Sequence, residues 1–216
     1  MTALLKVSLG VLGALGTGTA GVGGLYYGTN ITIDNEIGHE FLGDEDEFND
    51  SWKQKHEQLL AAPEDSLISD LKRIRKVHNT KESGAGVKAL KGWCNSAKIS
   101  SYKNIFTREN EQLLNLTKRY CIQQLKDKIE ANKLPVLTGN TDKETFKTNY
   151  KKLKEYKEQQ GKLDSELLKL KNNFKDGQEE TQWTAIQNWC SKSLEKAFKG
   201  SKDNLFLLTE TFCKKA

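Results

Sequence analysis

Two prolines, one methionine and four arginines occur among the 216 residues, and no cysteine precedes Cys94. The scarcity of proline removes the strongest barrier to helix, and charged residues, mostly lysine and glutamate, favour helix over sheet. No alternation of period two is evident along the chain, so we predict an all-α protein. The absence of an early cysteine excludes a lipid-anchored cysteine at the end of the apolar N-terminal segment.

Recognisable catalytic motifs are also lacking. The chain has no G-x-S-x-G, no H-E-x-x-H and no Walker lysine, and its cysteines are not spaced as the C-x-x-C pairs that structural zinc prefers. One G-x-G-x-x-G match lies inside the apolar N-terminal segment rather than between a strand and a helix, which argues against a nucleotide site. The three histidines stand near no cysteine or serine motif: His39, His56 and His78. We therefore expect no catalytic residue, no metal and no cofactor.

Residues 7–27 form an uncharged stretch, close to the roughly 20 residues that a helix needs to cross a bilayer. Lys6 precedes this stretch and an acidic segment follows it, so the positive-inside bias predicts export of the body. A cleaved signal peptide is the alternative, but no clean A-x-A cleavage site stands out, and we favour a retained anchor. Residues 1–28 are thus predicted to be an anchor or signal segment of a single-pass protein of the cell membrane, with its C-terminal body outside the cytoplasm.

Charge is unevenly distributed along the chain. The first fifty residues hold one base and eight acids, a net charge of −7, whereas residues 51–216 carry +12. We interpret residues 29–50 as a solvated acidic spacer. The basic body could attract polyanions or a host-cell surface. Genome composition also explains a lysine excess with so few arginines, and sites that bind phosphate in bidentate geometry usually recruit more arginine. Nucleic acid is therefore not the expected partner.

Two stretches about 96 residues apart share one skeleton, and this pattern predicts a duplicated unit. Each copy contains a Trp-Cys dipeptide followed by L-x-x-L-T-x-x-aromatic-Cys. In this alignment Phe48 and Trp52 correspond to Phe146 and Tyr150, and Leu71 corresponds to Leu170. Glycines at 84, 86, 161, 177 and 200 predict turns, and residues 141–144 fit a capping box. The expected domains are helical repeat 1 over 51–131, a linker over 132–141 and helical repeat 2 over 142–216, each repeat a small helical bundle.

The repeat also predicts how the four cysteines pair. Each copy owns one Trp-Cys and one terminal cysteine, so Cys94 with Cys121 and Cys190 with Cys213 is the pairing within copies. Each bridge closes a loop of about 25 residues and is worth roughly 3 kcal/mol in the chain-entropy model. Free buried thiols that act as small apolar residues are the alternative.

Two segments carry a resemblance to a known group of proteins: Gly24-Leu25-Tyr26-Tyr27-Gly28, and Leu90-Lys91-Gly92-Trp93-Cys94. With the lysine and asparagine bias, they resemble a large paralogous family of uncharacterised proteins of haemotropic mycoplasmas. The resemblance implies a surface or membrane-associated protein of a wall-less bacterium, antigenically variable or adhesive to blood cells. The family has no established activity, so no functional residue transfers to this chain.

Two functions are compatible with these observations. The first is a membrane-anchored, surface-exposed, non-enzymatic module that binds a host surface or acts as an antigen. The second is an exported enzyme that acts on nucleic acid, such as a nuclease. A metal-dependent nuclease needs clustered histidines and acids, and no such cluster is visible in the sequence, so we favour the first function.

Overall fold

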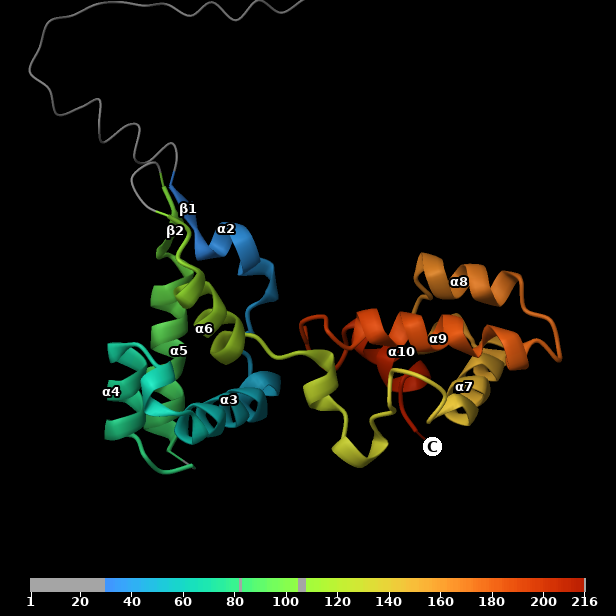
Figure 1. Cartoon of the computed structure of the whole chain (residues 1–216), viewed down its shortest axis with the longest axis horizontal. Helices are drawn as coiled ribbons and strands as arrows, with labels where there is room; N and C mark the ends of the chain where they lie inside the picture. The colour runs from blue at the N-terminus through green and yellow to red at the C-terminus, as the bar shows by residue number, and fades with distance from the viewer. Residues whose placement is uncertain (1–29, 82, 105–107, 216) are drawn as a thin grey trace, which may run out of the picture.

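The computed structural model describes residues 30–81, 83–104 and 108–215, and most of them are helical. Two groups of four helices lie beside each other and are joined by a segment of short turns (Figure 1). Unit 1 consists of α3 (Asn49–Ala61), α4 (Ser69–Val77), α5 (Gly84–Lys98) and α6 (Glu111–Cys121). Unit 2 consists of α7 (Lys143–Glu155), α8 (Ser165–Asn172), α9 (Glu179–Ser193) and α10 (Asn204–Phe212). The expectation of a mainly helical fold is confirmed.

The two units have the same order of helices and nearly the same helix lengths. These lengths are 13, 9, 15 and 11 residues in unit 1, and 13, 8, 15 and 9 residues in unit 2. The first helix of each unit packs against the third, and each unit has its own hydrophobic core. The helix boundaries correct our alignment by one turn at the first two helices. Trp52 and Phe146 are each the fourth residue of their helix, and Leu71 and Leu167 are each the third.

The segment before unit 1 differs from the predicted spacer. It contains β1 (Ile31–Thr32), α2 (Ile33–Ile37) and two 3-10 turns, η1 (Gly38–Glu40) and η2 (Asp46–Phe48). β1 pairs antiparallel with β2 (Ser101–Lys103), a pair too short to produce an alternating pattern in the sequence. Ile33 and Ile37 are buried against residues of β2 and α6. Leu42 and Phe48 join the core of unit 1, and the indole of Trp52 donates a hydrogen bond to the Gly43 carbonyl (2.8 Å). This segment packs against unit 1 through its buried apolar residues, and its acidic side chains face outward.

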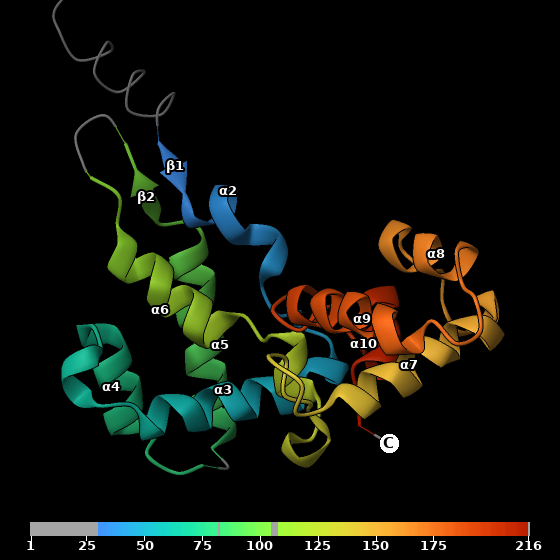
Figure 2. The same cartoon turned by 45° about the vertical axis from the view of Figure 1, so that its right-hand side comes forward.

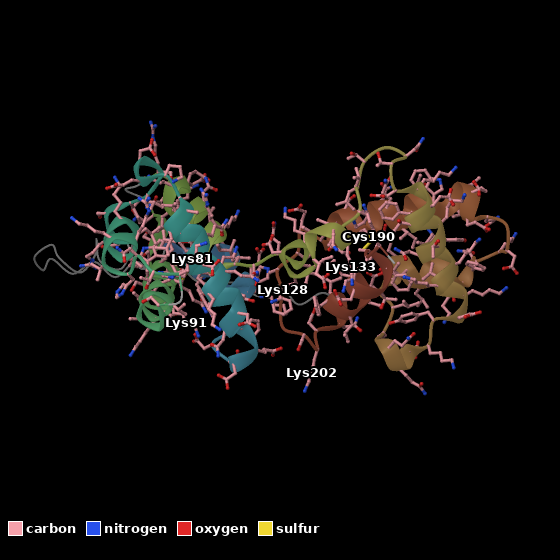
Figure 3. The ribbon with its side chains drawn as sticks, turned by 90° about the horizontal axis from the view of Figure 1, so that it is seen from below. Lys81, Lys91, Lys128, Lys133, Cys190 and Lys202 are labelled. Carbon is pink, nitrogen blue, oxygen red and sulfur yellow. A yellow bond between two sulfur atoms is a disulfide. The ribbon has the colours of Figure 1, made fainter. Side chains whose placement is uncertain are left out.

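The boundary between the units also differs from the predicted linker. Leu134 and Leu137 pack against the core of unit 2, and so does Ile129, which we had assigned to repeat 1. The turns η4 (Leu125–Lys128) and η5 (Ala131–Lys133) occupy this connection, and Figure 3 shows Lys128 and Lys133 on it. Unit 2 in turn contributes a residue to unit 1: Phe198 follows α9 in the sequence but belongs to the core of unit 1. The ring of Phe198 lies 5.7 Å from that of Phe48, centroid to centroid.

Backbone bonds reinforce this junction. Leu125 N–H donates to the Lys196 carbonyl (2.8 Å), and Phe198 N–H donates to the Gln123 carbonyl (2.7 Å). The Glu47 carboxylate accepts hydrogen bonds from the backbone and the hydroxyl of Ser201, and these bonds lower its pKa. The two units therefore pack against each other through shared elements, and they are not separate domains joined by a free linker.

Several turn predictions hold and two fail. Gly161, Gly177 and Gly200 have φ of 127°, 85° and 111°, in the region that favours glycine. Gly84, in contrast, begins α5, and Gly86 lies in its first turn, where the Ser83 hydroxyl accepts the Gly86 N–H (3.0 Å). The predicted capping box at α7 does not form, because Asp142 occupies the N-cap and its side chain makes no hydrogen bond to the helix. Short 3-10 turns precede α4 and α8, namely η3 (Glu64–Ser66) and η6 (Glu158–Gln160).

The proposed anchor, residues 7–27, lies outside the described residues. Among the residues that the structure describes, no helix is both long and apolar enough to cross a membrane.

Candidate functional site

Both predicted disulfides are formed. Cys94 on α5 bonds Cys121 at the end of α6, with Cα atoms 5.7 Å apart, and Cys190 on α9 bonds Cys213 just after α10, with Cα atoms 5.5 Å apart. All four cysteines are buried, so they act as structural staples between the third and fourth helices of each unit. They are not exposed thiols.

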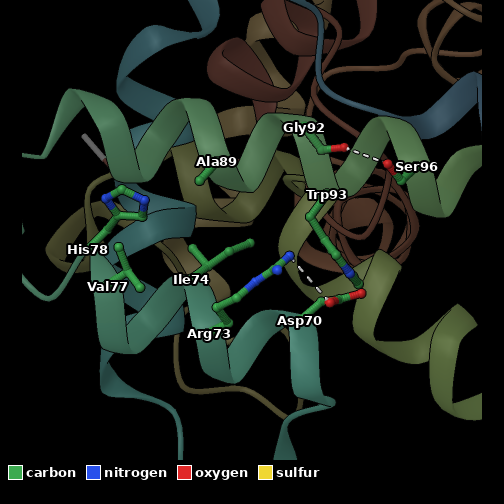
Figure 4. Close-up of a pocket in the computed structure, with 9 residues that line it drawn as sticks. All are labelled: Asp70, Arg73, Ile74, Val77, His78, Ala89, Gly92, Trp93 and Ser96. Atoms are coloured by element: carbon green, nitrogen blue, oxygen red, sulfur yellow. Dashed lines mark hydrogen bonds and ion pairs between the residues drawn. The ribbon is translucent and has the colours of Figure 1, made fainter.

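The tryptophan before each cysteine points toward the second helix of its unit. Trp189 is buried, and its indole donates to the Asp164 carboxylate (2.6 Å), which also accepts two N–H bonds as the N-cap of α8. Trp93 takes the equivalent place on α5 but lines an open groove against α4 (Figure 4). The same dipeptide therefore marks the contact of the second and third helices in both units.

The α4–α5 groove has a cavity volume of about 460 Å³ and a largely apolar floor. Ile74 and Trp93 are each only 8% exposed, whereas Val77 at the rim is 65% exposed. A Cβ atom added at Gly92 would meet nothing within 4 Å, so the helix surface is open there. The lining residues come from two turns of each helix: Asp70, Arg73, Ile74, Val77, His78, Ala89, Gly92, Trp93 and Ser96.

Unit 2 has a hollow at the same place, between α8 and α9, with a volume of about 410 Å³. Five of its lining residues stand 96 positions after lining residues of the first groove: Glu166, Lys169, Leu170, Asn173 and Ala185. An acid, a base and an aliphatic residue thus recur in order on the second helix of both units. The duplicated unit carries a duplicated groove, which sequence reasoning missed. The D-x-x-R-I-x-x-V and E-x-x-K-L-x-x-N patterns were the available signal.

The two grooves differ in polarity. Lys192 forms an ion pair with Glu166 (3.1 Å) beside the second groove, where the first groove has the small Ser96 in the equivalent position. Val77, an exposed apolar residue, is replaced by Asn173. The first groove also holds an ion pair, between Arg73 and Asp70 (3.6 Å), so the difference lies in the exposed valine at its rim.

The charge of the two helical hairpins differs more strongly. Residues 69–98, which contain α4 and α5, hold eight bases and two acids, whereas residues 165–193, which contain α8 and α9, hold four of each. All four acids of the second hairpin form ion pairs with lysines. On the first hairpin, no ion pair within the described part of the chain involves Lys72, Lys76, Lys81 or Lys88. These four lysines leave the first hairpin with a positive surface.

The acidic N-terminal segment neutralises only one side of that hairpin. Lys91 lies 3.8 Å from the Asp44 carboxylate, and Lys98 lies 3.4 Å from the Asp34 carboxylate. Both lysines are on α5, on the side covered by residues 30–50. The open bases on α4 and the α4–α5 turn are beyond that cover. Lys72 and Lys76 do not line the groove but a separate hollow, together with Glu64 and Arg75.

Two of the three histidines meet at one end of the first groove. His56 is fully buried, and neither of its ring nitrogens makes a hydrogen bond of good geometry within the described residues. Burial lowers the pKa of His56, and the backbone of His78 and Lys81 opposes the shift only in part. A Cβ atom at Gly86 would stand 2.3 Å from His56 Nε2, so glycine is required beside the ring. Unit 2 has the stacked rings of Tyr150 and Phe174 in the places of His56 and His78 (centroids 5.0 Å apart).

Metal ligands do not converge in the described parts of the chain. His39 is largely exposed, and no group of three or more histidine, cysteine, aspartate or glutamate residues there could hold a metal ion.

Comparison with known proteins adds no assignment. No described protein family, curated protein or solved structure is detectably similar to this chain.

Proposed function

We propose that the protein is a membrane-anchored, non-enzymatic binding module whose α4–α5 hairpin contacts an acidic partner outside the cell. The observation that carries this proposal is the contrast between two equivalent hairpins, one with a net charge of +6 and a groove with the exposed Val77 at its rim, the other with no net charge and Asn173 in that place. Because both hairpins stand on the same helical frame, the frame itself does not require the unpaired bases of the first.

The duplicated unit supports the same proposal. Unit 2 supplies Phe198 and the Ser201 contact that hold unit 1, while three of the four acids of its own hairpin form ion pairs with lysines of α7. We propose that the two units arose by duplication and then diverged, with unit 2 kept as a support and unit 1 as the binding face. Residues 7–27 would hold this assembly at the membrane, and a host-cell surface or an acidic polymer is the expected partner.

The test compares two charge reversals of equal size. One variant of the full chain carries Lys76→Glu, Lys81→Glu and Lys88→Glu on the first hairpin. Its matched control carries Lys157→Glu, Lys169→Glu and Lys175→Glu on unit 2, at positions that are also exposed. Both variants change the net charge by the same amount, so a purely non-specific attraction weakens equally in both.

We expect the first variant to bind erythrocytes and heparin-like polymer at least about tenfold more weakly than the control, a difference of about 1.4 kcal/mol. The measurement is binding across a salt series. Equal losses in both variants would remove the hairpin as the binding face. Metal-dependent cleavage of nucleic acid by the full chain, assayed in parallel, would instead support an exported nuclease.

A further inference from the structure

β1 is the first element that the structure describes, and its position restricts how residues 31–215 can be oriented relative to a membrane. Ile31 in β1 is the fourth residue after Tyr27, the end of the apolar stretch. A fully extended chain advances at most about 3.6 Å per residue, so Ile31 lies within roughly 14 Å of Tyr27. If residues 7–27 span the bilayer, β1 must lie in or close to the headgroup layer.

The end of unit 1 that carries β1 also carries the end of α5. Ile31 pairs with Lys103 of β2, and the Ile33 N–H donates to the Ser100 carbonyl (3.0 Å). Ile99, directly after α5, is therefore on the same end of the molecule as Ile31. Figures 1 and 2 both show β1 and β2 together at one extremity of unit 1, away from α4.

This end exposes two isoleucine side chains. Ile99 is 76% exposed and Ile31 is 37% exposed. Single exposed apolar residues are common on soluble surfaces, so exposure alone indicates no partner. The other large apolar residues exposed on the described part of the chain, Val77, Val136 and Leu168, belong to α4, the inter-unit connection and α8. The most exposed of all five is thus at the end that the chain length brings to the lipid.

Several charges near these isoleucines are paired, although no ion pair among the described residues involves the exposed Arg108. Lys103 forms an ion pair with Glu109 (2.7 Å), and the Tyr102 hydroxyl donates to the Glu111 carboxylate (2.8 Å). Hydrogen bonding to Glu111 raises the pKa of Tyr102, so this hydroxyl stays neutral. Lys98 is matched by Asp34. Contact at this end would therefore depend on apolar side chains, with little attraction to anionic headgroups.

We propose that the β1–β2 end of unit 1 rests on the lipid surface, with the side chains of Ile31 and Ile99 in the interfacial layer. This inference rests on the proposed anchoring by residues 7–27. It fixes the orientation of the body: α5, with 15 residues and about 1.5 Å of rise per residue, holds its first turn roughly 20 Å farther out than Ile99. The α4–α5 turn is then directed away from the membrane.

The experiment places a fluorescent label at residue 99 of the full chain, inserted into vesicles of zwitterionic phosphatidylcholine. Ile99→Cys provides the thiol, because the four native cysteines are bonded. Val77→Cys and Leu168→Cys are the matched controls, since both positions are exposed and apolar but lie on other faces. Quenching is measured with acyl chains that carry a nitroxide and with aqueous iodide.

We expect the label at residue 99 to lose most of its fluorescence to the lipid-borne quencher and little to iodide, with the reverse at residues 77 and 168. The result should be the same with anionic lipid added. A label at residue 99 that iodide reaches as readily as the control labels, in protein that remains with the vesicles after alkaline extraction, would overturn the orientation and leave the anchor standing. Quenching that requires anionic lipid would overturn the apolar contact. Protein that never joins the vesicles would overturn the anchor and the orientation together.

Discussion

Unit 1 and unit 2 use the same four-helix frame but satisfy their buried polar groups differently. Thr117 and Thr209 precede the last cysteine of their units by four residues, and both are buried. The Thr209 hydroxyl donates to the Leu205 carbonyl (2.7 Å), whereas the hydroxyls of Thr117 and Tyr120 in unit 1 have no hydrogen-bond partner among the described residues. Buried polar groups without partners cost free energy. Within the described residues, unit 1 thus holds two buried hydroxyls without partners, whereas on the helices of unit 2 the unpartnered buried side-chain atom is one oxygen of Glu179. Unit 1 also takes Phe198 into its core from outside its four helices.

The largest expected effect comes from removing the main addition that unit 2 makes to unit 1. Phe198→Ala deletes a ring that is 2% exposed and contacts Phe48 and Phe206 edge to face. Loss of a buried phenylalanine costs about 3–5 kcal/mol. We expect this loss in the free energy of unfolding, with faster amide hydrogen exchange in α3 and α5. Phe174→Ala, at a half-buried ring within unit 2, is the control and should cost less. Faster exchange confined to α9 and α10 would contradict the dependence of unit 1 on Phe198.

The disulfides allow the two units to be weakened in equivalent places. The bridges span sequence separations of 27 and 23 residues, so the chain-entropy model assigns each about 3 kcal/mol. We expect Cys94→Ala with Cys121→Ala, and Cys190→Ala with Cys213→Ala, to lower the free energy of unfolding by similar amounts. Urea unfolding of each double variant measures this. A loss in one variant more than twice that in the other would show that the staples are not equivalent.

The buried histidine should make unit 1 sensitive to acid. Burial holds the folded pKa of His56 below the unfolded value of about 6.5, so the unfolded chain binds more protons as the pH falls through that value. The stability contributed by neutral His56 is therefore present above about pH 6.5 and is lost as the pH falls toward the folded pKa. His56→Leu should flatten the unfolding free energy between pH 7 and pH 5, and His39→Leu, at an exposed site, should not. An unchanged slope in His56→Leu would assign the acid sensitivity elsewhere.

The smallest effect separates the two buried threonines. Replacement by valine keeps the shape of the side chain and removes the hydroxyl. Thr209→Val breaks a hydrogen bond and should destabilise the protein by about 1 kcal/mol, whereas Thr117→Val removes an unpartnered group and should be neutral or stabilising. Thermal unfolding of both variants supplies the comparison. Equal destabilisation would mean that the Thr117 hydroxyl has a partner, such as a buried water molecule.

Sequence reasoning reached the repeat and the cysteine pairing because identical dipeptides stand at corresponding places in both copies. It placed Phe48 opposite Phe146 because matching residue types ignores helix phase, and only the helix starts correct that register. It missed the packing of residues 30–50 because Ile33, Ile37 and Leu42 are single apolar residues among acids, too few to show a period. Phe198 was not predictable for another reason: it belongs to the core of the other copy, and no local pattern indicates a side chain that packs across the two units.

The candidate groove was equally difficult to predict. Its floor residues, Ile74 and Trp93, belong to the core pattern that any amphipathic helix shows. The groove exists because no other described element packs over Ala89 and Gly92. Local sequence does not reveal which parts of a helix surface will have a neighbour in the fold. The charge contrast between the hairpins, however, can be counted in the sequence once their boundaries are known.

The disulfides also determine what a single proteolytic cut can do to this protein. Lys103 and Arg108, which trypsin-like enzymes recognise, stand inside the loop closed by Cys94 and Cys121, and Lys199 and Lys202 stand inside the loop closed by Cys190 and Cys213. A cut after any of them divides the chain but leaves the pieces covalently joined. A protein of this design would keep its electrophoretic mobility on a non-reducing gel after such a cut, and separate fragments would appear only after reduction.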